Sequence, residues 1–215
     1  MKGDNRRILL LSTAAFVVCS AAAGVGLYRP LDVKVLGLAQ AHTSWVMDKV
    51  GLVTSVVGGV EFVAVVVVAL AVKLFVQGQR RLASRLLAAF VVTGLIELVF
   101  KMVVPQTPVP GDALHGPDPS LFDISTPYPY PSGHMLRAVL LLGAIYLLWP
   151  NRLGRIGLVA FLLASAVSRL YLETHWPSDL LGGALLGIAG LAWAFDKPSA
   201  VGRSAGNGCP HMLKC

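Results

Sequence analysis

Six long apolar segments alternate with short polar stretches along the chain. They run over approximately Ile8–Tyr28, Val57–Val76, Leu82–Val104, Met135–Trp149, Ile156–Leu172 and Ser178–Phe195. A helix needs roughly 20 mostly apolar residues to cross the hydrocarbon core of a bilayer, and these segments approach that length. Glycine and proline cluster between the segments or at their ends, where helices start and stop. The pattern therefore predicts an all-α bundle of about six transmembrane helices.

Composition supports a membrane protein. Of the 215 residues, 55% are hydrophobic and 13% are charged, whereas a soluble domain carries about a quarter charged residues. The length suits one compact bundle, so we expect a single membrane-embedded domain over residues 1–215. The first segment could alternatively be a cleaved signal peptide, but its apolar run is longer than a usual signal core, which favours a retained helix.

Lysine and arginine residues divide cleanly between alternate loops. One set comprises Lys2, Arg6, Arg7, Lys73, Arg80, Arg81, Arg85, Arg152, Arg155, Lys197, Arg203 and Lys214; the other has only Arg29, Lys34 and Lys49, all in its first loop. Positive residues stay in the cytoplasm, so we expect a plasma membrane protein with a cytoplasmic N-terminus (1–7) and tail (196–215) and an extracytoplasmic loop at 105–133. The net charge of +7 is mostly this signal and calls for no nucleic-acid partner.

Aromatic and cysteine residues add smaller constraints. Tyr28, Trp45 and Trp176 fall near predicted outer helix ends, where interfacial aromatic belts form. Cys19 lies inside the first segment, whereas the tail holds Cys209, His211 and Cys215. A metal cluster in that tail is one interpretation, but ligands without a supporting core are poorly preorganised, so a flexible tail is favoured.

Ionisable and small polar residues from separate regions meet at one predicted membrane face. Lys101 ends the third segment, Pro131–His134 precedes the fourth, Arg169 lies in the last turn of the fifth, and His175 and Asp179 flank the start of the sixth. Ionisable residues at membrane depth are costly and are functional candidates by default. Single residues of this kind often only snorkel to the interface, but the shared face favours a site.

The residue types indicate phosphate chemistry. Proline at a first helical position places Asp179 in the first turn, where it can fold back on His175 and leave one imidazole nitrogen free as a nucleophile. Ser132-Gly133-His134 would begin a helix, and a helix N-terminus favours an anion. Lys101 and Arg169 would add cationic donors. The set predicts an anion pocket with a nucleophilic histidine and a second histidine as acid or base.

These residues carry a resemblance to the type 2 phosphatidic acid phosphatase superfamily, the integral-membrane lipid phosphatases related to vanadium haloperoxidases. Its second motif is present as Pro131-Ser132-Gly133-His134. Its third is present as Ser168-Arg169, five residues, His175, three residues and Asp179. Six helices with an outward-facing site are also similar to bacterial members of the family, from the second segment onward.

The first motif of the family departs from the pattern. Members have an arginine and a proline seven and eight positions after the lysine, but Pro108 occupies the arginine position after Lys101. Arg137, three residues beyond His134, is a candidate substitute or alternatively a snorkelling arginine. Glu97 can orient Lys101 at i, i+4 or simply neutralise a buried charge.

The resemblance implies a mechanism and a substrate class. His175 would attack phosphorus to form a phosphohistidine, Asp179 would orient it, and His134 would protonate the leaving oxygen and then activate water. Lys101, Ser132, Gly133 and Arg169 would bind the phosphate oxygens. No metal or other cofactor is implied; a metal held by the two histidines and Asp179 is a rival interpretation that the neighbouring cations oppose.

Several functional alternatives remain open at this point. The substrate would come laterally from the bilayer, with polyprenyl diphosphate ahead of phosphatidic acid or phosphatidylglycerophosphate on family analogy. A catalytically impaired relative that binds or moves phospholipids is the alternative, motivated by the missing arginine. A peroxidase is disfavoured because no soluble domain surrounds the site. The segment 105–131 is either a lid over the site or a stiff connector.

Overall fold

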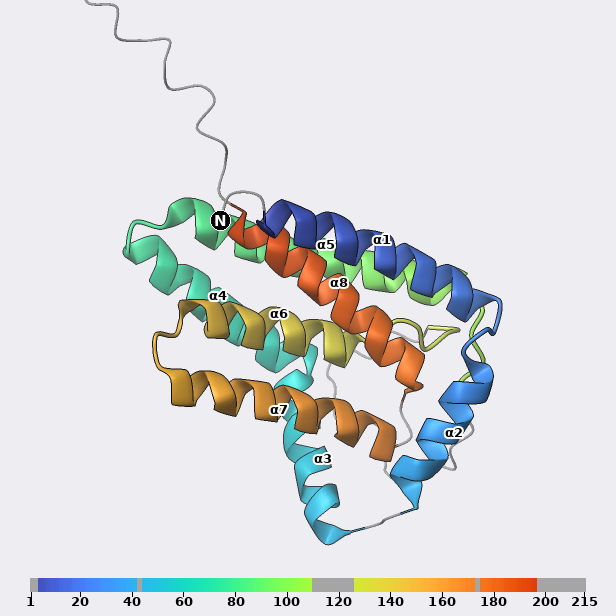
Figure 1. Ribbon diagram of the computed structural model, residues 1–215. Helices are drawn as coiled ribbons and strands as arrows, with labels where there is room; N and C mark the ends of the chain where they lie inside the picture. The colour runs from blue at the N-terminus through green and yellow to red at the C-terminus, as the bar shows by residue number, and fades with distance from the viewer. Residues whose placement is uncertain (1–3, 42–43, 110–125, 173–174, 197–215) are drawn as a thin grey trace, which may run out of the picture.

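The computed structural model describes residues 4–41, 44–109, 126–172 and 175–196, and these form eight α-helices and no strands (Figure 1). The helices are α1 (Asp4–Gly24), α2 (Arg29–Gln40), α3 (Trp45–Gly58), α4 (Val60–Val76), α5 (Arg80–Val103), α6 (Gly133–Leu148), α7 (Arg152–Tyr171) and α8 (Pro177–Phe195). Each of the six predicted segments contains a helix, which confirms the all-α bundle. Most of the predicted loop and tail, at 110–125 and 197–215, lies outside the described residues.

The segment between the first two predicted spans is helical, which the hydrophobic pattern did not indicate. Helix α2 has 12 residues and begins with Arg29-Pro30, where the missing N–H of proline costs no hydrogen bond. At a rise of 1.5 Å per residue it is about 18 Å long, too short to span a bilayer. Helix α3 continues into α4 across a bend of 53° at Gly59, and glycines are a usual cause of such a break.

Helix length and hydropathy define the spans. Four helices (α1, α5, α7 and α8) are long and apolar enough to cross a membrane, and the bent pair of α3 and α4 passes the same test when taken together. Helix α6 is apolar but has 16 residues, which gives it a length of about 24 Å. The described residues therefore form a multi-pass membrane bundle in which α6 is the shortest of the six predicted spans.

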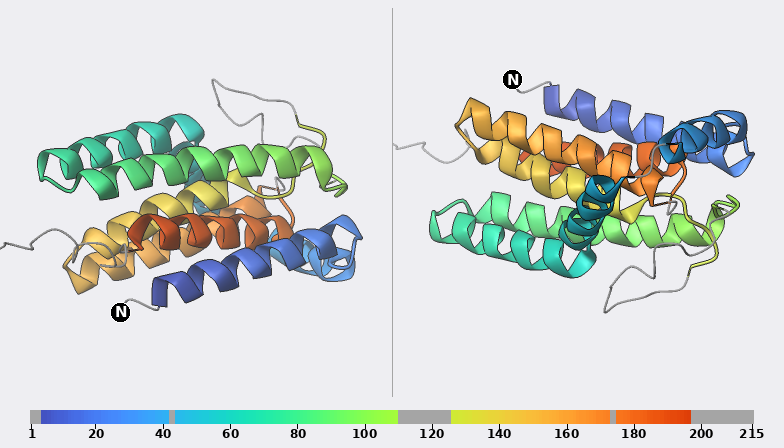
Figure 2. Two further views of the ribbon diagram at one scale, coloured as in Figure 1. Left: turned by 90° about the horizontal axis from the view of Figure 1, so that it is seen from above. Right: turned by 90° about the horizontal axis from the view of Figure 1, so that it is seen from below.

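Helix α8 is the most buried span and lies between α1 on one side and α5 and α6 on the other (Figure 2). Its glycines allow this close packing. A Cβ at Gly183 would lie 2.3 Å from the Ser132 carbonyl oxygen, and one at Gly187 would lie 2.9 Å from the Leu136 carbonyl oxygen. Small residues spaced four apart let two membrane helices approach to backbone contact, so this stripe brings the start of α6 against α8.

The two described ends of the chain lie at the same end of the bundle (Figure 1). The Asn5 side chain at the start of α1 donates a hydrogen bond to the Phe195 carbonyl oxygen at the end of α8, at 2.9 Å. The turns between α4 and α5 and between α6 and α7 lie at this end as well, and Lys73, Arg80, Arg81, Arg85, Arg152 and Arg155 flank them. The predicted site residues lie toward the opposite end, where α5 and α7 finish and α6 and α8 begin.

Candidate active site

The first turn of α8 holds a histidine and a carboxylate together. Pro177 occupies the first helical position, and Asp179 folds back so that its Oδ2 accepts a hydrogen bond from the Trp176 N–H at 3.0 Å and lies 3.2 Å from His175 Nδ1. Asp179 is fully buried. A carboxylate on Nδ1 keeps the proton on that nitrogen and leaves Nε2 as the free nitrogen of His175. The local geometry is the one expected from the spacing.

The start of α6 meets this turn through the backbone. Ser132 caps α6, with its Oγ accepting from the Met135 N–H at 3.4 Å, and its own N–H donates to the Asp179 carbonyl oxygen at 3.0 Å. The absence of a side chain at Gly183 allows this contact. The two motifs, more than 40 residues apart in sequence, are therefore joined in space by a main-chain hydrogen bond.

His134, in the first turn of α6, faces the same region as His175. Its imidazole lies within electrostatic range of Arg169, Arg137 and His175, and it forms a hydrogen bond to the Ser55 backbone. Its ring also packs against Gly58, where a Cβ would approach within 2.9 Å of the ring. The structure thus brings the two predicted histidines to one place.

Arg169 reaches the site from the last turn of α7. It is 2% exposed, and its Nη2 donates a hydrogen bond to Ser55 Oγ on α3. The neighbouring residue Ser168 is hydrogen-bonded to Thr54, with 2.6 Å between the two hydroxyl oxygens. Helix α3 therefore supports the arginine of the third motif, a role that sequence reasoning missed, although Thr54 and Ser55 interrupt an otherwise apolar stretch.

Glu97 holds two cations side by side. Its Oε1 lies 3.1 Å from Lys101 Nζ, and its Oε2 lies 3.1 Å from Arg137 Nη1. Arg137 also donates from Nε to the Gly58 carbonyl oxygen at 3.3 Å. Glu97 is buried and lies so close to Gly133 that a Cβ there would come 1.9 Å from Oε1. Of the two interpretations of Arg137, this placement favours a site residue over one that snorkels to the interface.

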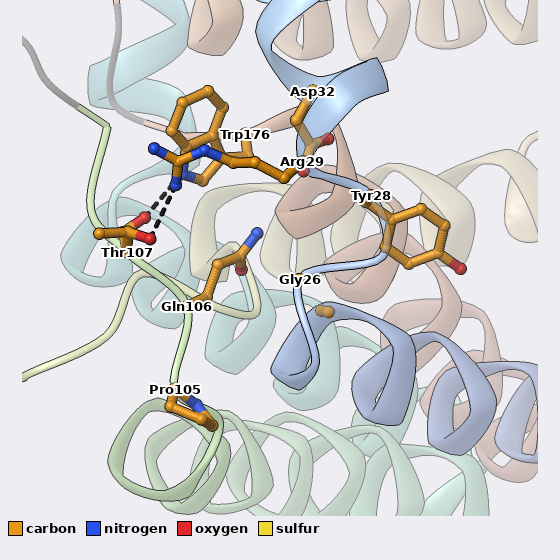
Figure 3. Close-up of a pocket in the computed structure, with 9 residues that line it drawn as sticks. Gly26, Tyr28, Arg29, Asp32, Pro105, Gln106, Thr107 and Trp176 are labelled. Atoms are coloured by element: carbon orange, nitrogen blue, oxygen red, sulfur yellow. Dashed lines mark hydrogen bonds between the residues drawn. The ribbon is translucent and has the colours of Figure 1, made fainter.

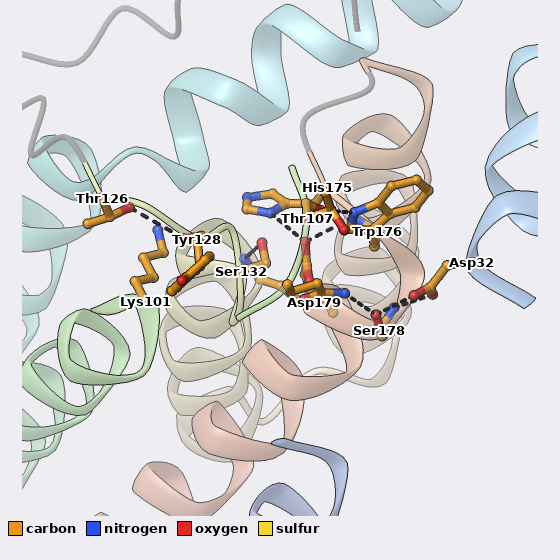
Figure 4. A network of polar contacts seen from close by, with 12 residues as sticks. Asp32, Lys101, Thr107, Thr126, Tyr128, Ser132, His175, Trp176, Ser178 and Asp179 are labelled. Carbon is orange, nitrogen blue, oxygen red and sulfur yellow. Dashed lines mark hydrogen bonds and ion pairs between the residues drawn. The ribbon is translucent and has the colours of Figure 1, made fainter. Parts of the chain in front are cut away.

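A second polar network supports the α8 turn from the other side. Asp32 on α2 accepts hydrogen bonds from the Ser178 N–H at 3.0 Å and the Ser178 hydroxyl at 2.7 Å (Figure 4). Burial raises the pKa of the Asp32 carboxyl above its usual value, and the two bonds from Ser178 oppose that rise. Trp176, expected in an interfacial belt, is instead 2% exposed and donates from Nε1 to the Thr107 carbonyl oxygen at 2.7 Å.

The site therefore consists of helix ends that converge from α5, α6, α7 and α8. Figure 4 shows Lys101, Ser132 and His175 near one another, with Asp179 next to His175. Three cations and a helix N-terminus can bind an oxyanion, and a histidine held by a buried carboxylate can attack it. Among the described residues, no group of three histidine, cysteine or acidic side chains is arranged to hold a metal ion.

This fold and site define a polytopic membrane protein in which histidines and cationic side chains gather at one end of the bundle. A model of the PAP2 superfamily matches residues 80–202, more than half of the chain, and the chain belongs to this superfamily. The match covers α5 to α8 and therefore every predicted site residue.

Two known proteins are similar to this chain. The undecaprenyl-diphosphatase of Sulfolobus acidocaldarius is 34% identical over 131 residues, and the chain spans 60% of the length of that relative. The crystal structure of a transmembrane PAP2 type phosphatidylglycerolphosphate phosphatase from Bacillus subtilis superposes with a TM-score of 0.71 at 19% identity. That superposition covers 86% of this chain and 93% of the other, and it establishes the fold.

Proposed function

We propose that this protein is a membrane lipid phosphatase that acts on lipid phosphate monoesters or diphosphates. One observation carries the proposal: the His175–Asp179 pair lies at the end of the bundle where three cations from other helices gather, Lys101 and Arg137 on Glu97 and Arg169 near His134. A buried carboxylate, an oriented imidazole and converging cations are suited to phosphoryl transfer. The activities named for the two relatives support the same class of reaction.

In the first step, the His175 Nε2 lone pair attacks phosphorus and forms a P–N bond. The bond between phosphorus and the leaving oxygen breaks, and His134 donates a proton to that oxygen. For a monoester the leaving group is a lipid alcohol, and for a diphosphate it is a lipid monophosphate. Asp179 stabilises the positive charge that develops on the His175 ring.

In the second step, water hydrolyses the phosphohistidine. Neutral His134 takes a proton from the attacking water, the P–N bond breaks with its electron pair returning to His175, and inorganic phosphate leaves. Lys101, Arg169, the Ser132 hydroxyl and the backbone at Gly133 bind the phosphate oxygens. These groups are fixed by α-helix ends before substrate arrives, so little reorganisation is needed during reaction.

The position of the site in the bundle supports an orientation of the protein in the membrane and a route for a lipid substrate. The site lies at the opposite end of the bundle from the turns between α4 and α5 and between α6 and α7, and the positive-inside rule then supports a site on the extracytoplasmic face of the plasma membrane with both termini in the cytoplasm. A lipid would enter laterally and bring its phosphate to the helix ends. Polyprenyl diphosphate is the first substrate to test, followed by phosphatidic acid and phosphatidylglycerophosphate; no protein partner or cofactor is assigned.

Purified protein in detergent should release phosphate from at least one of these three lipids in the presence of a chelator. The reason is that the proposed nucleophile and cations are all side chains of the chain itself. Phosphate release with and without EDTA measures this directly. Activity that disappears with EDTA and returns with a divalent ion would instead support a metal-dependent reaction.

A second candidate function rests on Pro108, which occupies the arginine position of the first family motif. A relative with a weakened phosphate site could bind or move phospholipids without cleaving them. The same assay separates the two functions. Saturable lipid binding with no phosphate release from any of the three lipid classes would favour this alternative.

Arg137 is expected to replace the missing arginine of the first motif. In Arg137→Gln we expect kcat/KM to fall by roughly 10- to 100-fold, because a hydrogen bond to a charged group contributes about 1.5–3 kcal/mol. Arg155→Gln is a matched control, since Arg155 also donates to backbone carbonyls but lies at the opposite end of the bundle. Steady-state kinetics of the two variants would measure the difference.

A rescue experiment separates substitution from simple structural support. Thr107, which adjoins position 108, accepts a hydrogen bond from the Trp176 side chain, and Trp176 adjoins His175 in sequence. Adding Pro108→Arg to Arg137→Gln should restore part of the lost kcat/KM if an arginine at either position binds the phosphate group. If Arg137→Gln behaves like Arg155→Gln, Arg137 does not bind phosphate.

A further inference from the structure

The break between α3 and α4 frees main-chain carbonyl groups from helical hydrogen bonding. The Gly59 N–H donates to the Val56 carbonyl oxygen at 3.2 Å, so it does not supply the bond that the Ser55 carbonyl would receive in a continuous helix. Gly58 is the last residue of α3, and the last four carbonyls of a helix have no donor within that helix. At membrane depth, freed backbone groups must find partners in the protein. The break therefore calls for donors from neighbouring helices.

Two side chains of the candidate active site supply these donors. Arg137 on α6 donates from Nε to the Gly58 carbonyl oxygen at 3.3 Å. The His134 imidazole is hydrogen-bonded to the Ser55 backbone. The Ser55 N–H lies inside α3 and belongs to the helical ladder, so the group that meets the ring is the carbonyl. His134 must then donate, which keeps a proton on the nitrogen that faces α3 and directs the other ring nitrogen to the substrate.

Ser55 also holds a cation of the site through its side chain. Its Oγ accepts a hydrogen bond from Arg169 Nη2, and the hydroxyl of the neighbouring Thr54 lies 2.6 Å from the Ser168 hydroxyl. Buried hydroxyl groups need such partners, whereas an aliphatic face would offer none. The buried face of α3 accordingly consists of small residues, which are Gly51, Thr54, Ser55 and Gly58.

The His134 ring lies so close to Gly58 that a side chain there would not fit. A Cβ at Gly58 would approach within 2.9 Å of His134 Cδ2 and 3.6 Å of His134 Cβ. Gly58 is the last residue of an α-helix, so glycine serves here to make space for the ring. The position of the ring is thus set by the Ser55 carbonyl and by the bare backbone at Gly58.

The nucleophile is held from another direction. The Arg29 guanidinium lies 5.0 Å from the centre of the Trp176 ring, and its Nη1 donates to Thr107 Oγ1 at 2.7 Å. These residues line a cavity of about 300 Å³ at the elbow between α1 and α2 (Figure 3). The Trp176 N–H in turn holds Asp179. Helix α3 packs on α6 and α7, so changes at its end should leave this turn of α8 in place.

We propose that the end of α3 is a positioning element for phosphoryl transfer. The Ser55 hydroxyl places Arg169 on the phosphate, and the Ser55 carbonyl together with Gly58 places His134 at the leaving oxygen. This inference rests on the proposed function. It adds residues that lie outside the 80–202 match to the family model. The two roles have different consequences: a misplaced arginine weakens phosphate binding for every substrate, whereas a misplaced histidine impairs only substrates whose leaving group needs a proton.

Gly58→Ala should lower kcat/KM for an alkyl phosphate far more than for an aryl phosphate. The probes are dihexanoyl phosphatidic acid, whose alcohol must be protonated as it leaves, and p-nitrophenyl phosphate, whose phenolate is stable without a proton. We expect a loss of at least about tenfold for the first and less than about threefold for the second, because general acid catalysis contributes roughly 10²–10⁴-fold. Gly51→Ala on the same helix meets the flexible Leu172 side chain at 3.2 Å and should leave the ratio of the two values unchanged.

Ser55→Ala should weaken binding of inorganic phosphate and leave that ratio unchanged, because it removes the acceptor of Arg169 but keeps the carbonyl that meets His134. We expect the Kd for phosphate, taken from the shift of the unfolding midpoint with phosphate concentration, to rise at least about threefold. Ser55→Thr keeps the hydroxyl and should bind phosphate as wild type does. Ser12→Ala removes a buried hydroxyl that donates to the Ile8 carbonyl oxygen at 2.6 Å, near the opposite end of the bundle, and should have no effect on binding.

The outcomes separate this inference from the proposed function. A wild type that neither binds phosphate nor cleaves either ester would overturn both. If wild type binds phosphate without cleaving, the proposed function fails and the Ser55 variants decide the inference by binding alone. Equal losses for the two esters in Gly58→Ala, or equal phosphate binding by Ser55→Ala and Ser55→Thr, would show that α3 supports the fold without positioning these groups. Unfolding midpoints without phosphate check each variant, and the Ser55 pair carries the test if Gly58→Ala does not fold.

Discussion

Replacing His175 with alanine should abolish turnover of every lipid substrate. Removal of the nucleophile from a catalytic triad lowers kcat by up to about 10⁶-fold. We expect kcat to fall by at least about 10³-fold here. The reason is that, in the proposed mechanism, Nε2 of this ring forms the covalent bond to phosphorus, and alanine has no group that can do so. Phosphate release by wild type and His175→Ala, compared at equal protein concentration, measures the loss.

Two controls separate loss of a nucleophile from loss of the fold. The unfolding midpoint of His175→Ala should stay near that of wild type, because the ring contacts Asp179 among the described residues, and Asp179 keeps its hydrogen bond from the Trp176 backbone N–H. Exogenous imidazole should restore part of the activity by occupying the space of the missing ring. A phosphate label that is stable in base and labile in acid should appear on wild type and be absent from the variant. Undiminished turnover in His175→Ala would overturn the mechanism.

The local parts of the site could be predicted from the sequence because their geometry is set within one helical turn. Asp179 follows His175 by four residues, and Pro177 begins α8 between them. The first turn of the helix therefore brings the two side chains together. The same is true of Glu97 and Lys101 on α5, which form the predicted i, i+4 pair. The six apolar segments were predictable for a different reason, because bilayer thickness sets a minimum length.

The supporting residues could not be predicted, because they depend on contacts between distant segments. Asp32 and Ser178 are 146 positions apart, and Thr54 and Ser168 are 114 apart. Each of these residues alone looks like an ordinary small polar residue of a loop or helix. Helices α2 and α3 that carry Asp32 and Thr54 were missed because neither is long enough to give the signal of a span.

Trp176 shows the same limitation. A tryptophan next to a predicted membrane boundary is usually interfacial, and the sequence contains no sign that Arg29 and Thr107 would enclose it. Its burial depends on α2 folding back over the start of α8. Sequence patterns therefore predicted the contacts of His175 with Asp179 and of Glu97 with Lys101 better than they predicted the residues that pack around them.

The second large effect is expected at Gly183, where α8 contacts the start of α6. A Cβ there would lie 2.3 Å from the Ser132 carbonyl oxygen and 3.2 Å from the Leu136 nitrogen, and both are backbone atoms that cannot rotate away. Gly183→Ala must therefore push the two helices apart. Overpacking typically costs 1–3 kcal/mol, and a clash with backbone should fall at the upper end, about 3 kcal/mol.

This displacement should also impair catalysis, because the Ser132 N–H bond to the Asp179 carbonyl oxygen spans the same contact. We expect both the free energy of unfolding, measured by denaturant titration in mixed micelles, and kcat to fall together. Gly94→Ala on α5 is the matched control, since a Cβ there meets no atom within 4 Å. That variant should be neutral or gain up to about 1 kcal/mol, because alanine loses less conformational entropy than glycine in a helix. Equal stability and activity in the two variants would mean that α6 and α8 do not need backbone contact to assemble the site.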